Sequence, residues 1–134
     1  MSKIYVGIDI GLAGALASID KKNVKGLKMP MLGKKVDPHD IIKELELLKP
    51  DHVVFEKLGV IFGTSKATAF SMGEQSGIIQ TACICLGVPY TIVPAKEWQK
   101  AMYTGVPETK KSNGKRDTKA MALIACKRIF PNLE

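Results

Sequence analysis

The stretch that decides the fold is KIYVGIDI, residues 3–10 of the 134-residue chain. Its apolar residues are β-branched and nearly continuous, which predicts a strand buried on both faces of a sheet. One residue breaks the pattern, because Asp9 stands inside this strand and an unpaired carboxylate is costly to bury. The anomaly recurs in a second predicted strand, residues 52–58, where Glu56 follows three apolar residues. These two carboxylates are the first candidates for chemistry.

The segments around these strands alternate as in an α/β protein. Strands predicted at 15–19 and 25–31 form an antiparallel meander with the first one. Asp37 and Pro38 predict the start of a helix, as its N-cap and first residue, and Pro50 ends it. The remaining predicted elements are a helix at about 66–86, a strand at 89–93, a helix at 95–103, a polar loop at 104–114 and a helix at 115–130. The order βββ-α-β-α-β-α predicts a mixed five-stranded sheet flanked by helices on both faces.

Length and composition favour one soluble domain spanning residues 1–134, since the chain is too short for two good cores. No apolar run is long enough to cross a bilayer, and the N-terminus carries neither a charged leader nor a cleavage site, so we expect a cytoplasmic protein without membrane contact. The three cysteines are poorly spaced for zinc, and we expect reduced thiols in or near the core. Gly73 and Gly77 fall on one face of the long helix and predict close backbone packing against the sheet.

The positive charge is concentrated near the C-terminus. Residues 96–128 contain nine Lys or Arg against three Asp or Glu, which accounts for +6 of the net charge of +7. Such focusing is typical of a protein that binds a polyanion. The alternative is a solvated, lysine-rich surface that only keeps the protein soluble.

Asp9 and Glu56 converge if their strands are parallel neighbours. That arrangement suits Mg²⁺, which takes oxygen ligands and keeps waters for substrate phosphates. Two such ions can activate a water and stabilise the leaving oxygen in phosphodiester cleavage. The alternative is structural: Asp9 caps the following turn, and Glu56 pairs with Lys57 or Lys3.

Five segments, in order along the chain, resemble those of RuvC-like Holliday-junction resolvases of the variety common in phages and bacteria. GIDIGLAGAL (7–16) resembles the first-strand motif and VVFEK (53–57) the second. AFSMG (69–73) with GII (77–79) resembles the helix that follows. LGVPY (86–90), VP (93–94) and KEWQK (96–100) match a further block, and residues 117–131 resemble a basic helix ending in Phe-Pro. Each block is weak alone, and the collinear set is specific.

The resemblance implies an RNase H-like fold, a homodimer, and Mg²⁺-dependent nicking of four-way DNA junctions, with Mn²⁺ as a substitute, in recombination, repair or phage genome processing. Asp9 and Glu56 carry over as catalytic metal ligands. Phe62 stands where the family often has an aromatic wedge, although it can equally anchor its loop. Trp98 is expected to be a core residue rather than a stacking platform. The expected DNA contacts are Lys66, Lys96, Lys100, Lys110, Lys111, Lys115, Arg116 and Lys119.

The chain departs from the family where a last helix should add two acidic residues. Asp117 and Glu134 do not fit those positions, so two carboxylates make a thin shell for two ions. Two interpretations follow: a C-terminally truncated resolvase, or a short relative that binds branched DNA without cutting it. A kinase fragment, suggested only by the turn between Gly11 and Gly14, is a more distant third.

Overall fold

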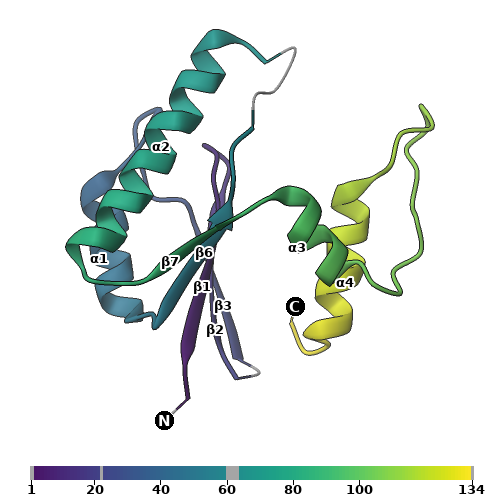
Figure 1. Ribbon diagram of the computed structural model, residues 1–134, viewed down its shortest axis with the longest axis horizontal. Coiled ribbons are helices and arrows are strands. Elements are labelled where there is room, and N and C mark those ends of the chain that lie inside the picture. The colour runs from purple at the N-terminus through teal and green to yellow at the C-terminus, as the bar shows by residue number, and fades with distance from the viewer. Residues whose placement is uncertain (1, 22, 60–63, 134) are drawn as a thin grey trace. The chain divides into compact units, whose positions relative to one another are not determined.

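The computed structural model describes residues 2–21, 23–59 and 64–133 (Figure 1). The chain divides into two compact units, unit 1 (Met1–Pro94) and unit 2 (Ala95–Glu134). Unit 1 contains β1 (Ile4–Asp9), β2 (Ala15–Asp20), β3 (Asn23–Lys28), β4 (Met31–Leu32), β5 (Lys35–Val36), α1 (Pro38–Leu48), β6 (His52–Glu56), α2 (Lys66–Cys85) and β7 (Tyr90–Val93). Unit 2 contains α3 (Ala95–Met102) and α4 (Thr118–Ile129). The expectation of one domain over the whole chain stays a prediction.

Five strands of unit 1 form one mixed sheet in the order β3-β2-β1-β6-β7. β1, β2 and β3 are antiparallel neighbours, as the predicted meander requires. β1 pairs in parallel with β6, and β6 in parallel with β7. The predicted mixed five-stranded sheet is therefore confirmed, and the short β4–β5 hairpin is an addition that the sequence pattern did not indicate.

One face of this sheet carries the main core. Val6, Ile8, Val53 and Phe55 point to it and are at most 4% exposed. They pack with buried residues of α1 and α2, which Figure 1 shows on the same side of the sheet. On the other face, the β1 residues Tyr5, Gly7 and Asp9 are exposed or half-buried. The prediction that β1 is buried on both faces was thus wrong, because its apolar residues alternate between a covered and a more open side.

Side-chain caps fix where the two helices of unit 1 begin. Asp37 caps α1 as predicted, its Oδ1 accepting from the His39 N–H at 3.0 Å, and Ser65 caps α2 through the Thr68 N–H at 3.1 Å. The packing role predicted for Gly73 and Gly77 was wrong. A Cβ at either position would meet nothing within 4 Å, so neither glycine mediates a close approach.

Unit 2 has its own small core of Tyr103, Met121 and Ala125, against which Trp98 packs. The rings of Trp98 and Tyr103 meet edge to face at 5.6 Å, so Trp98 is a core residue as expected. α4 begins at Thr118 rather than at residue 115, because Asp117 caps it by accepting from the Ala120 N–H at 3.1 Å.

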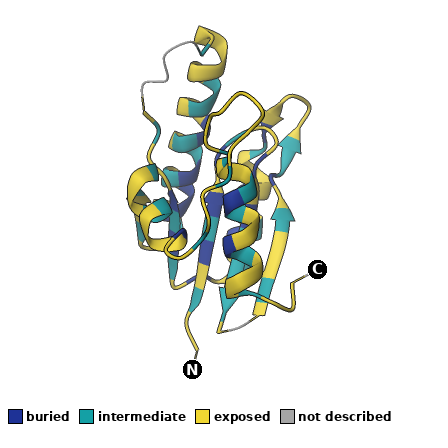
Figure 2. Cartoon of the chain, turned by 90° about the vertical axis from the view of Figure 1, so that its right-hand side faces the viewer, coloured by how far each residue is buried: buried dark blue, intermediate teal, exposed yellow. Residues whose placement is uncertain are grey.

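The thiols are free, and they differ in burial. Cys83 is buried in the main core, Cys126 is half-buried and Cys85 is exposed, so the expectation of thiols in or near the core was wrong for Cys85. Figure 2 shows buried residues concentrated on the strands and on inward helix faces. Among the described residues, no helix is both long and apolar enough to cross a bilayer.

Candidate functional site: a carboxylate pair and a basic unit

The two candidate carboxylates end two adjacent parallel strands. The β1–β6 register pairs Gly7 with Val54 and Ile8 with Phe55, so one further step places Asp9 opposite Glu56. Neighbouring strands are about 4.8 Å apart, and both residues occupy positions that alternate away from the core face. The predicted convergence of Asp9 and Glu56 at one sheet edge is therefore present in the strand register.

Both carboxylates are exposed, which differs from the burial expected for them. Only the sheet face that carries Val6 and Phe55 is buried, and Asp9 and Glu56 lie on the opposite face. Neither carboxylate therefore pays the desolvation cost that a buried charge would. Exposure leaves their oxygens within reach of solvent, a cation or a phosphate-bearing ligand.

The loop after β1 folds back tightly on Asp9. The Gly14 N–H donates to the Gly11 carbonyl at 3.0 Å, and the Met29 N–H donates to the Gly14 carbonyl at 3.0 Å. A Cβ on Gly14 would stand 2.0 Å from the Asp9 carbonyl oxygen, so only glycine fits there. Gly14 thereby lets this loop close against the residue that carries the first carboxylate.

The structure argues against two of the structural explanations for these carboxylates. The Ile4 N–H donates to Asp51 Oδ2 at 2.8 Å, and Tyr5 pairs with His52, so Lys3 lies at the opposite end of the strands from Glu56. Six residues of strand separate Lys3 from Glu56, about 20 Å, which excludes an ion pair. The turn after β1 closes through the backbone of Gly11 and Gly14 and does not need Asp9 as its cap.

Two carboxylates are enough to hold one Mg²⁺ ion but too few to hold two ions. Mg²⁺ is commonly held by one or two carboxylates, with waters and substrate phosphates completing six ligands. Within residues 2–21, 23–59 and 64–133, no group of three or more His, Cys, Asp or Glu is placed to hold a metal ion. If a Mg²⁺ bound here, Asp9 and Glu56 would supply only part of its coordination shell, and the described residues do not supply a second shell.

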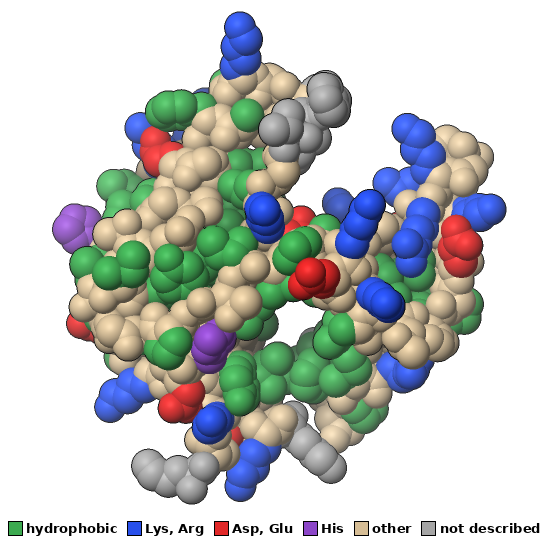
Figure 3. Space-filling view, in the orientation of Figure 1, with side chains coloured by type: hydrophobic (Ala, Val, Ile, Leu, Met, Phe, Trp, Pro, Cys, Tyr) green, Lys and Arg blue, Asp and Glu red, His purple; other side chains and the backbone are tan. Residues whose placement is uncertain are grey.

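The predicted DNA contacts fall into distinct groups. Lys66 begins α2 in unit 1, and the other lysines and the arginine lie in unit 2. Figure 3 shows Lys and Arg side chains gathered over the segment that joins α3 to α4. Lys119 is exposed in the first turn of α4, and Phe62 lies outside the described residues. The role of each of these residues stays a prediction.

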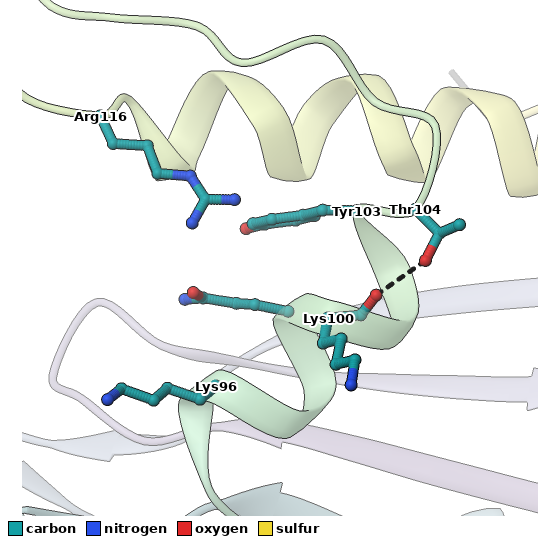
Figure 4. A pocket seen from close by; sticks show the side chains of 6 residues that line it. Lys96, Lys100, Tyr103, Thr104 and Arg116 are labelled. Atoms are coloured by element: carbon teal, nitrogen blue, oxygen red, sulfur yellow. Dashed lines mark hydrogen bonds between the residues drawn. The ribbon is translucent and has the colours of Figure 1, made fainter.

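Three of the basic residues line one pocket of unit 2, with a volume of about 340 Å³ (Figure 4). Its lining consists of three cations and three uncharged residues: Lys96, Gln99, Lys100, Tyr103, Thr104 and Arg116. In Figure 4 the Arg116 guanidinium points toward the Tyr103 ring, and the side chains of Lys96 and Lys100 leave α3 in different directions. The Thr104 hydroxyl donates to the Lys100 carbonyl at 2.8 Å. The lining contains no carboxylate, so an anion bound in this pocket would meet positive charge without a competing negative group.

Arg116 is held in place before any ligand arrives. Its guanidinium carbon is 5.7 Å from the centroid of the Tyr103 ring, and its Nε donates to Met121 Sδ at 3.4 Å. The Tyr103 hydroxyl in turn donates to the Thr118 carbonyl at 3.0 Å. Sequence reasoning missed Tyr103, Gln99 and Thr104. The spacing from Trp98 to Tyr103 does not follow a simple helical stripe, so no periodic signal marked Tyr103.

Comparison with known proteins gives a clear result for the fold. No protein-family model and no curated protein matches this sequence. The structure resembles RuvC of Thermus thermophilus in complex with a Holliday junction substrate, with a TM-score of 0.72 and 16% identity over 98% of this chain and 82% of that chain. A second T. thermophilus RuvC structure gives a TM-score of 0.64 at 14% identity with the same coverage. The chain therefore has a RuvC-like, RNase H-like α/β fold, as its motifs predicted.

Proposed function

We propose that this protein is a metal-dependent endonuclease that resolves four-way DNA junctions, acting in the cytoplasm as a homodimer in recombination, repair or phage genome processing. The observation that carries the proposal is the placement of Asp9 and Glu56 at the ends of adjacent parallel strands, in a RuvC-like fold. The solved RuvC complex with a Holliday junction substrate supports branched DNA as the ligand.

In this proposal Asp9 and Glu56 hold Mg²⁺, or Mn²⁺ in its place, as oxygen ligands. When bound, the ion supplies an activated water and stabilises charge on the leaving oxygen. The chain's own contribution is to orient the substrate. Cations of unit 2, including Lys96, Lys100 and Arg116 around the pocket, bind backbone phosphates and restrain the strand to be cut.

A second function is favoured by one observation. Because the described residues provide only part of a metal shell, a branched-DNA-binding protein without nuclease activity also fits the site. Such a protein keeps the salt-dependent phosphate contacts and does not need Asp9.

The test uses a four-way junction labelled on each strand in turn, incubated with purified protein and Mg²⁺. We expect paired nicks at symmetric positions, abolished by Asp9→Asn and by Glu56→Gln. The matched control is Glu46→Gln, an exposed carboxylate on α1, which should nick like the wild type.

Three outcomes separate the proposals. Wild-type protein that binds the junction and never nicks it, with Mg²⁺ or Mn²⁺, contradicts the nuclease and supports the binding protein. Equal affinity for the junction and for a linear duplex contradicts the junction selectivity that both the nuclease and the binding-protein proposals assume. A monomeric mass in sedimentation equilibrium, with and without DNA, contradicts the homodimer.

A further inference from the structure

The segment between α3 and α4 contains a β-hairpin that the sequence pattern did not indicate. The Asp117 N–H donates to the Thr109 carbonyl at 2.6 Å, and Lys110 and Arg116 form an antiparallel bridge. Residues 109–117, named here the basic hairpin, therefore form a short two-stranded ribbon. Figure 1 shows this segment of unit 2 extending past the start of α4.

The turn of the basic hairpin is held by its own backbone. The Lys111 N–H donates to the Lys115 carbonyl at 2.8 Å, and the Gly114 N–H donates back to the Lys111 carbonyl at 2.9 Å. Asn113 Oδ1 accepts from the Lys115 N–H at 3.0 Å, and Gly114 has φ +78°. A positive φ at this position suits glycine, so the Asn-Gly pair specifies a defined turn rather than a loose loop.

The hairpin is ordered although it buries almost nothing. Residues 110–116 are all exposed, as Figure 2 shows for this segment, and none of them is apolar. Apart from the contacts of Arg116 with Tyr103 and Met121, hydrophobic burial therefore does not account for its conformation.

Its charges also oppose its own stability. Lys110 faces Arg116 across the ribbon, and Lys111 is hydrogen-bonded to Lys115. Like charges facing one another on paired strands are destabilising. Glu108 precedes the hairpin, and Asp117, the one acid within it, is engaged as the cap of α4, so the hairpin holds four cations against one carboxylate. An array of this kind becomes favourable when a polyanion lies against it.

We propose that the basic hairpin is a groove-binding ribbon for duplex DNA, contacting phosphates on both sides of the groove. This inference rests on DNA being the ligand in the proposed function. The major groove admits a two-stranded ribbon and is about 8.5 Å deep, and the three residues from Thr109 to Lys111 span about 10 Å. The ribbon binds one duplex arm, so its contribution to DNA affinity is the same for linear and branched DNA.

The test measures DNA binding by fluorescence anisotropy in EDTA over a series of KCl concentrations. The variant K110Q/K111Q/K115Q removes three charges and keeps the turn. The slope of log K against log salt is negative, and each lost phosphate contact reduces its magnitude by about 0.9. We therefore expect the magnitude of the slope to decrease by about 2–3 for both a linear duplex and a junction. The matched control K25Q/K28Q/K34Q removes three exposed lysines of unit 1 and should keep the wild-type slope.

A second pair of variants tests the shape of the ribbon. Gly114→Val forces a β-branched residue into a positive-φ turn while every charge stays. Gly33→Val imposes the same strain at φ +63° in the β4–β5 turn, where a Cβ meets nothing within 4 Å. We expect Gly114→Val to weaken binding several-fold and Gly33→Val to leave it unchanged.

The outcomes are separable from those of the nuclease proposal. An unchanged salt slope in K110Q/K111Q/K115Q overturns the inference even if the wild type nicks junctions. A slope of smaller magnitude supports it even if the wild type never nicks. Wild-type affinity in Gly114→Val, or the same loss in Gly33→Val, overturns the role of the folded ribbon.

Discussion

Replacing Gly14 with alanine tests whether the loop after β1 positions Asp9. The added Cβ would stand 2.0 Å from the Asp9 carbonyl oxygen and 2.9 Å from the Gly11 carbonyl oxygen, whereas real Cβ contacts stay above 3.0 Å. The Asp9 carbonyl and the loop must therefore separate by about 1 Å. Neither obstacle is a flexible side chain, and β1 is hydrogen-bonded to β2 on one side and to β6 on the other, so the movement is costly.

Two magnitudes follow from this displacement. Forcing extra atoms into a filled space costs about 1–3 kcal/mol of unfolding free energy, and the backbone obstacles place Gly14→Ala near the upper end. A displacement of about 1 Å at a reacting group lowers rates by about 100-fold. Urea unfolding followed by circular dichroism measures the first effect, and junction nicking over a Mg²⁺ titration measures the second.

The control is Gly26→Ala in β3, where a Cβ meets nothing within 4 Å. It should unfold at the wild-type urea concentration or slightly above it, because alanine restricts the unfolded chain. A Gly14→Ala protein with wild-type stability and nicking would refute the claim that this glycine sets the position of Asp9. Lost stability with unchanged nicking would refute the positional part alone.

Three further predictions concern α2. Gly73→Ala and Gly77→Ala should each raise the unfolding free energy by about 0.5–1 kcal/mol, because both sites have room for a Cβ; a loss in urea titration contradicts this. Gln75 is 3% exposed, and its Oε1 has no hydrogen-bond partner. Gln75→Met should therefore leave the unfolding free energy unchanged or raise it by up to about 1 kcal/mol, and a clear decrease in the unfolding free energy contradicts this. Burial raises the pKa of the Cys83 thiol above 9.0, so its contribution to stability is complete below pH 9 and is lost as the pH rises through the raised pKa. Urea unfolding at pH 8 and pH 10 should show that loss in the wild type and not in Cys83→Ala.

Much of unit 1 was predictable because its signals are local. Asp37 followed by Pro38 marked the start of α1, and the runs around Val6 and Val53 marked two strands. The strand register then brought Asp9 and Glu56 together, since parallel neighbours end at the same edge.

Other features depend on the environment of a residue rather than on its spacing. The exposure of Asp9 follows from which face of the sheet is covered, and a nearly continuous apolar run does not reveal that. The open space around Gly73 depends on how far α2 stands from its neighbours. The basic hairpin contains no apolar residue, so hydrophobic periodicity gives no signal there. The Asn113-Gly114 pair is a turn signal that was not used in the prediction.

The pairing of β1 with β6 has a consequence for the order of folding. The Ile4 N–H and Asp51 Oδ2 that fasten this pair are 47 residues apart, whereas β1 and β2 are joined by a short turn. Closing the long loop costs more entropy than forming the local meander, so we expect the meander to form first. During synthesis Asp9 is then in place before the strand of Glu56 can dock. The nascent chain would thus acquire its carboxylate pair late, only after the helix α1 that connects the two strands has been made.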